Sequence, residues 1–433
     1  MNIDRIENTV RNSFDKYELF FVKERVKKFE SREKELYDAE LKEEEGIALR
    51  VIKNNKLAFS YTYDDSDNAL SSLLENTKTI VNLLEDDEGV CFAGGCEHYP
   101  TLPLYDDSGL QSDDEQKIQL LVNLEKAILD YDRRIIATRN CELREIETFV
   151  KIVNSNGLNA EGRRTLYILS ALCVAKEEDE VSWYDWSWSN YLKEINGEKF
   201  GIGVAQKTIS FLSSEQIPTG IYSGILTPQA SCDMLSILTQ SFLGENLYKD
   251  KTKLKDKIGI QCFSEKITIK DSGFSGMGAF PFDGEGVSSK ENIVVKSGYF
   301  QTFLYDCYYG KKFGYPSTGN AIRRSLREPP LCGPRGLFIQ KGDKDIINDN
   351  TEGIVIEELI GTHTANPVTG DFSLGAIGHL YQGGIKIPFK GVIFSGNIFE
   401  LFNNVKEEGP DLQFYGTYGS PSLLIEGMKI SGK

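Results

Sequence analysis

The residues best suited to chemistry in this chain of 433 residues are its histidines, of which there are only three. Two of them, His363 and His379, lie in one stretch, GTHTANPVTGDFSLGAIGHL. A zinc hydrolase built on two histidines of one helix is excluded, because no two histidines stand three to five residues apart. Turn signals at Asn366-Pro367 and Gly370 separate the pair. A catalytic or metal-binding strip and a simple run of strand and turn therefore both stay open.

Two smaller groups of polar residues also call for an interpretation. Cys91, Cys96 and His98 offer ligands that zinc accepts, but their spacing is not a common finger spacing and no second pair completes it. We interpret them as part of a glycine-rich loop and assign them no role. The acids Asp283 and Glu285 in FPFDGEGV are close enough for acid–base work. Hydrogen bonding to backbone amides in a tight turn is the interpretation we favour.

A nucleophile activated by histidine needs separate consideration, because the members of a catalytic triad are neighbours in space rather than in sequence. No G-x-S-x-G elbow is present, and the similar GFSGMG at 273–278 lies among turns. The sequence contains no P-loop and no dinucleotide-binding fingerprint. A free-standing hydrolase that uses His363 or His379 is kept as an alternative.

The charge and hydropathy of the chain limit its partners. Lys and Arg number 49 against 65 Asp and Glu, so the net charge is −16, which repels nucleic acids and anionic lipids. The longest apolar run, 166–175, is about half of the roughly 20 residues that a membrane span needs. The first residues show no signal peptide. We expect a cytoplasmic protein with no direct nucleic-acid or membrane binding, and free thiols at its eight cysteines.

The hydrophobic patterns predict an α+β protein. The N-terminal half should be an α/β arrangement of β-meanders with packed helices, and the C-terminal half mostly antiparallel β with few helices. A hairpin is expected across Asn54-Asn55. The linker SSEQIPTG divides the chain into an N-terminal α+β domain, 1–218, and a C-terminal β-rich domain, 219–433. The hairpin should bring apolar side chains face to face, namely Ile47, Leu49 and Val51 against Leu57, Phe59 and Tyr61.

Capping residues predict where the helices begin. Helices are expected over 3–14, after Asp65 or Ser66, and near 201–213. Ser112 to Glu115 has the form of a capping box. Thr227 and Pro228 begin a further helix, and 397–405 is the only helix expected after residue 259. Trp183, Trp186 and Trp188 form either a stacking platform for a ligand or an edge strand packed against a partner.

Five motifs in order give the chain a resemblance to a known family. They are FPFDGEGV, STGNAIRR, TANPVTGDFSLGAIG, SGNIFELFNNV and GSPSLLIEGMKISG. Together they resemble the C-terminal half of the TldD/TldE family, also called PmbA or modulators of DNA gyrase. The likeness extends back through GIALRVIKNNKLAFSY and VNSNGLNAEGRRTLY, so it covers nearly the whole chain.

The resemblance implies a subunit without its own metal. In TldD-like chains the helix after the central linker resembles HExxxH and binds zinc together with a later cysteine. Here that helix reads SCDMLSILTQSFLGE, with Leu235 and Gln240 where the two histidines would stand, and no cysteine follows Cys332. The segment NPVTGDFS also has the TldE form. We therefore expect no cofactor in this chain, with zinc in a TldD-like metalloprotease partner.

The resemblance further implies a role in the proteolysis or maturation of unfolded peptides, with this chain inactive alone. The glycine-punctuated strip suits a groove for extended peptide. A free-standing peptide-binding homodimer is an alternative, and the tryptophan cluster suggests aromatic surface that a homodimer would cover when no TldD-like partner is present. The residues expected to line the groove are His363, Asn366, Thr369, Gly370, Asp371 and Ser373.

Overall fold

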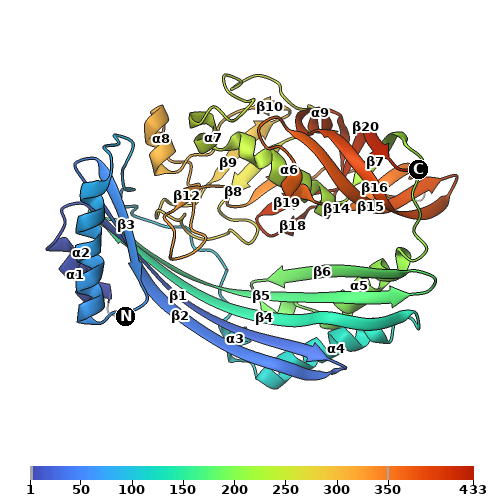
Figure 1. Ribbon diagram of the computed structural model, residues 1–433, viewed down its shortest axis with the longest axis horizontal. Helices are drawn as coiled ribbons and strands as arrows, with labels where there is room; N and C mark the ends of the chain where they lie inside the picture. The colour runs from blue at the N-terminus through green and yellow to red at the C-terminus, as the bar shows by residue number, and fades with distance from the viewer. Residues whose placement is uncertain (1–2, 349–350) are drawn as a thin grey trace.

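The first half of the chain forms one long, curved sheet, and the second half lies over it (Figure 1). The computed structural model describes residues 3–348 and 351–433, and its mixture of helices and sheets confirms the predicted α+β class. The long sheet is antiparallel, in the order β3-β2-β1-β4-β5-β6. Its strands are β1 (Tyr17–Arg32), β2 (Glu35–Lys53), β3 (Lys56–Thr62), β4 (Ile135–Asn154), β5 (Asn159–Lys176) and β6 (Glu180–Ser189).

The helices of the first half pack on this sheet. Helices α4 and α5 share a buried core with it, in which Leu124, Tyr167 and Val204 are almost wholly inaccessible to solvent. Among the described residues, no helix is both long and apolar enough to cross a lipid bilayer. The helices are α1 (Ile3–Arg11), α2 (Asp67–Leu83), α3 (Asp107–Gln111), α4 (Asp114–Leu129) and α5 (Gly197–Ser210).

The hairpin between β2 and β3 forms at the predicted turn, but its register differs from the prediction by one residue. Asn54 and Asn55 both have positive φ, at 52° and 57°, as a two-residue primed turn requires. That turn pairs Val51 with Ala58 rather than with Leu57. A shift of one residue moves every side chain to the other face, so the expected apolar contacts are wrong. The error affects Ile47, Leu49 and Val51 on β2 and Leu57, Phe59 and Tyr61 on β3.

Two helix caps bear on the predictions. Of the two candidates Asp65 and Ser66, Ser66 caps α2: its hydroxyl oxygen accepts a hydrogen bond from the backbone amide of Ala69. The box expected at Ser112 is wrong, because Asp113 caps α4 instead. Ser112 is already used at the end of α3, where its N–H and hydroxyl both donate to the Gly109 carbonyl.

The second half contains two larger sheets around one core. One has the order β10-β9-β8-β13-β19-β18, and the other β16-β15-β14-β7-β20-β17. In the latter, β16 also pairs with β20, which closes five strands into a ring. The strands are β7 (Gly220–Leu226), β8 (Ile269–Ser272), β9 (Glu291–Lys296), β10 (Tyr299–Phe300), β11 (Ala321–Ile322), β12 (Leu331–Cys332), β13 (Leu337–Ile339), β14 (Gly353–Ile360), β15 (Asp371–Gln382), β16 (Ile385–Asn397), β17 (Val405–Glu408), β18 (Gln413–Tyr415), β19 (Tyr418–Ser420) and β20 (Leu423–Ser431).

One helix after residue 259 was not predicted. Its sequence, CYYGKKF, carries no apolar periodicity, but Asp306 caps its beginning and Gly314 ends it in the left-handed region at φ 74°. The expectation of a single helix after residue 259 is therefore wrong. The helices are α6 (Pro228–Thr239), α7 (Gly244–Tyr248), α8 (Cys307–Phe313) and α9 (Ile398–Asn403).

The tryptophans of β6 pack within the chain itself. Trp183 is only 2% exposed. The indole N–H of Trp188 donates to the Phe414 carbonyl at 3.2 Å, and the rings of Trp186 and Tyr415 meet edge to face. The expectation that this cluster exposes aromatic surface is wrong for Trp183, which stacks on Phe211, whereas Trp186 and Trp188 stay half-buried where they contact β18.

Candidate functional site

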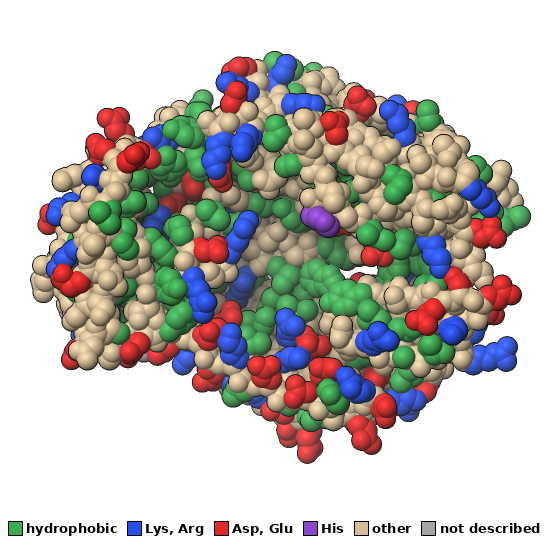
Figure 2. All heavy atoms as spheres, viewed as in Figure 1, with side chains coloured by type: hydrophobic (Ala, Val, Ile, Leu, Met, Phe, Trp, Pro, Cys, Tyr) green, Lys and Arg blue, Asp and Glu red, His purple; other side chains and the backbone are tan. Residues whose placement is uncertain are grey.

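A cavity of about 470 Å³ lies where the long sheet faces the second half. Figure 2 shows the molecule hollowed between its two layers, with hydrophobic side chains gathered in the hollow. Strands β1, β4 and β5 form one wall of the cavity, and the other wall consists mainly of loops and short strands between residues 277 and 335, with contributions from 240–245 and 417–418. Its apolar lining includes Phe20, Val150, Leu243, Phe280, Phe282 and Leu331.

Four arginines line the same cavity, although the chain is strongly acidic. Arg323 is paired with Glu18 at 2.6 Å. Arg164, Arg324 and Arg335 have no carboxylate within ion-pair distance among residues 3–348 and 351–433. Arg164 donates to the Met277 carbonyl at 2.6 Å. Burial lowers the pKa of Arg164, and the nearby charge of Arg335 lowers it further.

Asp283, at the edge of the cavity, is held by the backbone. Its Oδ1 accepts hydrogen bonds from the amides of Glu285 and Val287, both at 2.9 Å, and its Oδ2 accepts one from Ala321 at 3.0 Å. Burial, together with the charge of Glu285, raises the pKa of Asp283 to about 6. The favoured interpretation of these acids as turn-forming residues is confirmed for Asp283.

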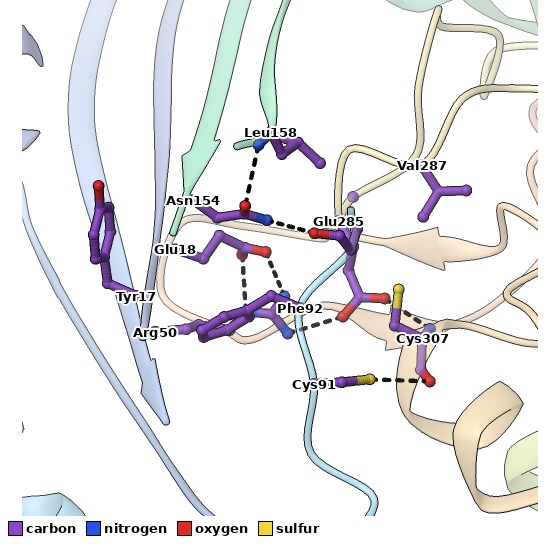
Figure 3. A network of polar contacts seen from close by, with 12 residues as sticks. Tyr17, Glu18, Arg50, Cys91, Phe92, Asn154, Leu158, Glu285, Val287 and Cys307 are labelled. Carbon is purple, nitrogen blue, oxygen red and sulfur yellow. Dashed lines mark hydrogen bonds and ion pairs between the residues drawn. The ribbon is translucent and has the colours of Figure 1, made fainter. Parts of the chain in front are cut away.

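Glu285 instead belongs to a buried ion network that joins the two halves (Figure 3). Arg50 on β2 donates to both oxygens of Glu18, at 2.8 and 2.7 Å, and to Glu285 Oε1 at 3.0 Å. Glu285 Oε2 accepts from the backbone amide of Cys307 at 2.9 Å. Arg323 completes the network through Glu18. All four charged side chains are at most 5% exposed, so the network fixes how the cavity walls face one another.

The strip predicted as a groove forms a turn and the half-buried strand β15, and none of its six residues lines this cavity. Asn366 Oδ1 accepts from the amides of Val368 and Thr369, at 2.9 and 3.1 Å. Asp371 accepts from the hydroxyl of Thr369 at 2.7 Å and from Asn397 at 2.8 Å. The polar side chains that sequence reasoning selected therefore shape this turn. The remaining members are His363 and Ser373, which are exposed, and Gly370, which is buried at φ 79°.

The two histidines of the strip do not come together as a site. His379 is 1% exposed, its Nδ1 lies 2.8 Å from Glu357 Oε1, and its Nε2 lies 3.4 Å from the Ser210 carbonyl. Burial alone would raise the pKa of Glu357, but the hydrogen bond with His379 and the Lys207 ammonium lower it to about 2. His379 therefore stabilises the contact between α5 and β14.

The cysteines at 91 and 96 also have local partners. The Cys91 thiol faces the Cys307 carbonyl at 3.3 Å, and the Cys96 thiol faces the His98 carbonyl at 3.2 Å. All eight cysteines are free, as expected. In the described part of the chain, no three His, Cys, Asp or Glu side chains form a group that could hold a metal ion.

Three consecutive segments of the chain match the domains of one metallopeptidase family. Residues 17–81 match PmbA/TldA metallopeptidase domain 1, residues 107–212 match the central domain, and residues 219–432 match the C-terminal domain. The chain belongs to the PmbA/TldD/TldE family. The resemblance drawn from the five sequence motifs is confirmed.

Curated relatives cover most of the chain. An uncharacterized protein of Methanocaldococcus jannaschii is 30% identical over 395 residues, which cover 89% of both chains. A metalloprotease PmbA homolog of Haemophilus influenzae is 25% identical and covers 93% of this chain and 89% of its own. A zinc metalloprotease TldD homolog of Saccharolobus solfataricus is 24% identical and covers 90% of both.

Solved structures show the same fold. TldE from Thermococcus kodakarensis superimposes with a TM-score of 0.90 at 22% identity, covering 99% of this chain and 100% of its own. A Thermotoga maritima protein described as a DNA gyrase modulator gives 0.89 at 23% identity, with 99% of each chain covered. The fold that encloses the cavity is therefore the fold of these solved structures.

The zinc that the family name implies does not fit the residues of α6. Leu235, one of the two positions expected to carry a ligand, is fully buried in the apolar core of the second half. Gln240, the other, lies directly after α6 and lines the cavity. A leucine side chain has no donor atom, so this pair cannot hold zinc. The end of α6 thus faces the cavity with an amide side chain instead of a pair of metal ligands.

Sequence reasoning missed the arginines of the cavity. Arg324 belongs to the motif STGNAIRR, but Arg164 and Arg335 come from distant segments that only the fold brings together. The net charge of the whole chain is negative, so the composition does not indicate that arginines cluster at one place in the fold.

Proposed function

We propose that this chain is the zinc-less, TldE/PmbA-like subunit of a two-subunit metalloprotease, and that its partner is a TldD-like chain that carries the zinc. The observation that carries the proposal is the α6 site, where the buried Leu235 and the cavity-lining Gln240 replace a ligand pair. A cavity that Gln240 lines without a second ligand at Leu235 suits a subunit that binds or positions substrate.

The substrate in this proposal is unfolded peptide, which the complex degrades or matures. The cavity of about 470 Å³ has the size and mixed apolar and polar lining of a ligand-binding site. We keep the strip of residues 363–373 as a second part of the peptide path, with contacts through its exposed side chains, because β15 is hydrogen-bonded to β14 and β16 and has no free edge. Its proposed contacts are His363, Asn366, Thr369, Gly370, Asp371 and Ser373.

Assembly and compartment complete the proposal. When no TldD-like chain is present, we expect a homodimer. The half-buried Trp186 and Trp188 and three exposed isoleucines on the second-half ring offer apolar side chains for its interface, and aromatic and apolar side chains are typical of interface cores. Free thiols throughout support a reducing compartment such as the cytoplasm. The exposed isoleucines are Ile221 at 72%, Ile385 at 64% and Ile360 at 54%.

The alternative of a hydrolase that uses histidine receives no support. His379 is buried with both ring nitrogens engaged. His363 is exposed on a single helical turn and, among the described residues, hydrogen-bonds to no acid or thiol. The peptide-binding homodimer keeps the same cavity, so only a partner experiment separates it from our proposal.

The proposal is tested with purified chains. This chain, a TldD-like chain from the same genome and their mixture are each incubated with unfolded casein, with and without a zinc chelator. We expect cleavage in the mixture, little or none with either chain alone, and loss of cleavage with chelator. Cleavage by this chain alone that survives chelator would refute the proposal. A mixture no more active than the TldD-like chain alone would leave the homodimer.

A further inference from the structure

Most arginines of the cavity are held by backbone carbonyls rather than by carboxylates. Arg335 donates from Nε and Nη2 to the carbonyls of Gly278 and Phe280, with the buried Asp271 and Asp283 nearby but outside ion-pair distance. Three guanidinium groups, those of Arg164, Arg324 and Arg335, have no carboxylate partner within ion-pair distance in the part of the chain that the structure describes. Two acids line the cavity, but Asp283 is occupied by three backbone amides and Glu245 is paired with Lys249.

Two buried nitrogen atoms beside the cavity also lack a hydrogen-bond acceptor. They are the Nη1 atoms of Arg323 and Arg335, whose side chains are about nineteen-twentieths buried. Buried donors without a partner are rare in folded proteins and call for an explanation such as a water or a ligand. An acidic chain that gathers three arginines without carboxylate partners in one hollow has the electrostatics of an anion site.

The remaining lining of the cavity shows what kind of anion fits. Phe20, Phe280 and Phe282 lie on the same walls as the arginines, with further aliphatic side chains around them. A small inorganic anion would leave this apolar surface in contact with water. A ligand with a carboxylate beside an apolar group would pair with the guanidinium groups and cover the apolar wall at once.

We propose that the cavity binds the free C-terminal carboxylate of a peptide whose last side chain is apolar, with Arg164, Arg324 and Arg335 around the carboxylate. This inference rests on the proposed function for its choice of a peptide as ligand. Arginine suits the role because its planar guanidinium group can donate two parallel hydrogen bonds to one carboxylate. The cavity would then hold the end of a substrate while the remainder extends along the cleft.

The binding test uses the full chain without any partner, so that it is independent of proteolysis. The probe is a fluorescein-labelled hexapeptide of glycine and alanine that ends in phenylalanine, compared with its C-terminal amide by fluorescence anisotropy in the presence of chelator. Loss of charge-assisted hydrogen bonds should weaken binding of the amide at least about tenfold. A third peptide, amidated but with an internal glutamate, should bind as weakly as the amide.

Matched variants locate the site. Arg164→Gln and Arg324→Gln should each weaken binding of the free acid by about tenfold and bring its affinity close to that of the amide. Arg163→Gln is the control, because Arg163 is adjacent on β5 but stacks 3.9 Å over the Tyr105 ring and does not line the cavity. It should bind the free acid as the wild type does, and circular dichroism confirms that each variant is folded.

Several outcomes would overturn the inference. Equal affinity for acid and amide, no binding of either, or tight binding of the internal-glutamate peptide would each exclude recognition of a C-terminus. Inorganic phosphate that displaces the peptide at lower concentration than N-acetylphenylalanine would indicate a phosphate site instead. Failure here with casein cleavage by the mixed subunits still intact would remove only this inference and leave the proposed function standing.

Discussion

The buried network between the two halves should make a large contribution to stability, which can be measured by replacing Arg50 with methionine. Arg50 makes three hydrogen bonds to Glu18 and Glu285, and all of these side chains are at most 5% exposed. The intact network holds two carboxylates and two guanidinium groups, so its charges balance. Arg50→Met leaves two buried carboxylates against Arg323 alone.

The expected cost follows from this imbalance. Removing one partner of a buried ion pair typically destabilises a protein by 3–5 kcal/mol, because the charge left behind is poorly solvated, and we expect a loss of about that size. Since many proteins have a total stability of about 5–15 kcal/mol, the urea midpoint should fall markedly. Tryptophan fluorescence is a suitable probe, because Trp186 and Trp188 contact the second half at β18.

Two further variants show whether buried charge is the cause. Lys42→Met removes a cation from the same strand, but Lys42 is solvent-exposed beside Glu44 and its loss should leave the midpoint almost unchanged. Arg50→Met combined with Glu285→Gln restores the balance of one carboxylate and one guanidinium, so it should be more stable than Arg50→Met alone. Arg50→Met with the midpoint of the wild type, or a double variant less stable than the single one, would refute the reasoning.

Two other predictions concern local structure. The pKa of Glu357 is lowered from 4.5 to about 2 in the folded state. The charged carboxylate therefore stabilises the fold above the unfolded pKa, and this contribution is lost as pH falls through the folded pKa. Glu357→Gln should cost about 3 kcal/mol at pH 7, and its difference from wild type in thermal denaturation should shrink between about pH 5 and pH 2. A pH-independent difference would contradict it. Gly201→Ala on α5 should destabilise the chain by about 1–3 kcal/mol, because the new Cβ would lie 2.5 Å from the Leu124 carbonyl oxygen. Gly203→Ala on the same helix is the control, because its new Cβ meets no atom within 4 Å and should stabilise the chain by roughly 0.5–1 kcal/mol. Equal effects of the two variants in urea denaturation would be inconsistent with this packing.

Local patterns predicted the elements of the fold better than their contacts. The Asn54-Asn55 turn was visible in the sequence, but the pairing of Val51 with Ala58 depends on the turn geometry, which moves the register by one residue. Helix α8 was missed because its seven residues show no periodicity, and only its caps reveal it. Trp188 was expected in an exposed cluster because nothing in its neighbourhood indicates that β18, more than 200 residues later, packs against it.

The candidate site shows the same limit. Motifs in order were sufficient to predict the family, because motifs depend on residue identity, while the zinc-less character of α6 stays a prediction. The strip around Asn366 was chosen for its polar side chains, which mostly serve its own turn. Arg164 and Arg335 were overlooked because they are far apart in the sequence and meet only in the folded cavity.

The most direct test of the central claim is native mass spectrometry of this chain mixed with its TldD-like counterpart. One spectrum reports both the assembly and its metal content. We predict a species that contains one copy of each chain and one zinc ion, together with zinc-free homodimer of this chain. Zinc bound at one ion per copy to this chain alone, or a mixture in which the two chains never associate, would contradict the assignment as a zinc-less partner subunit.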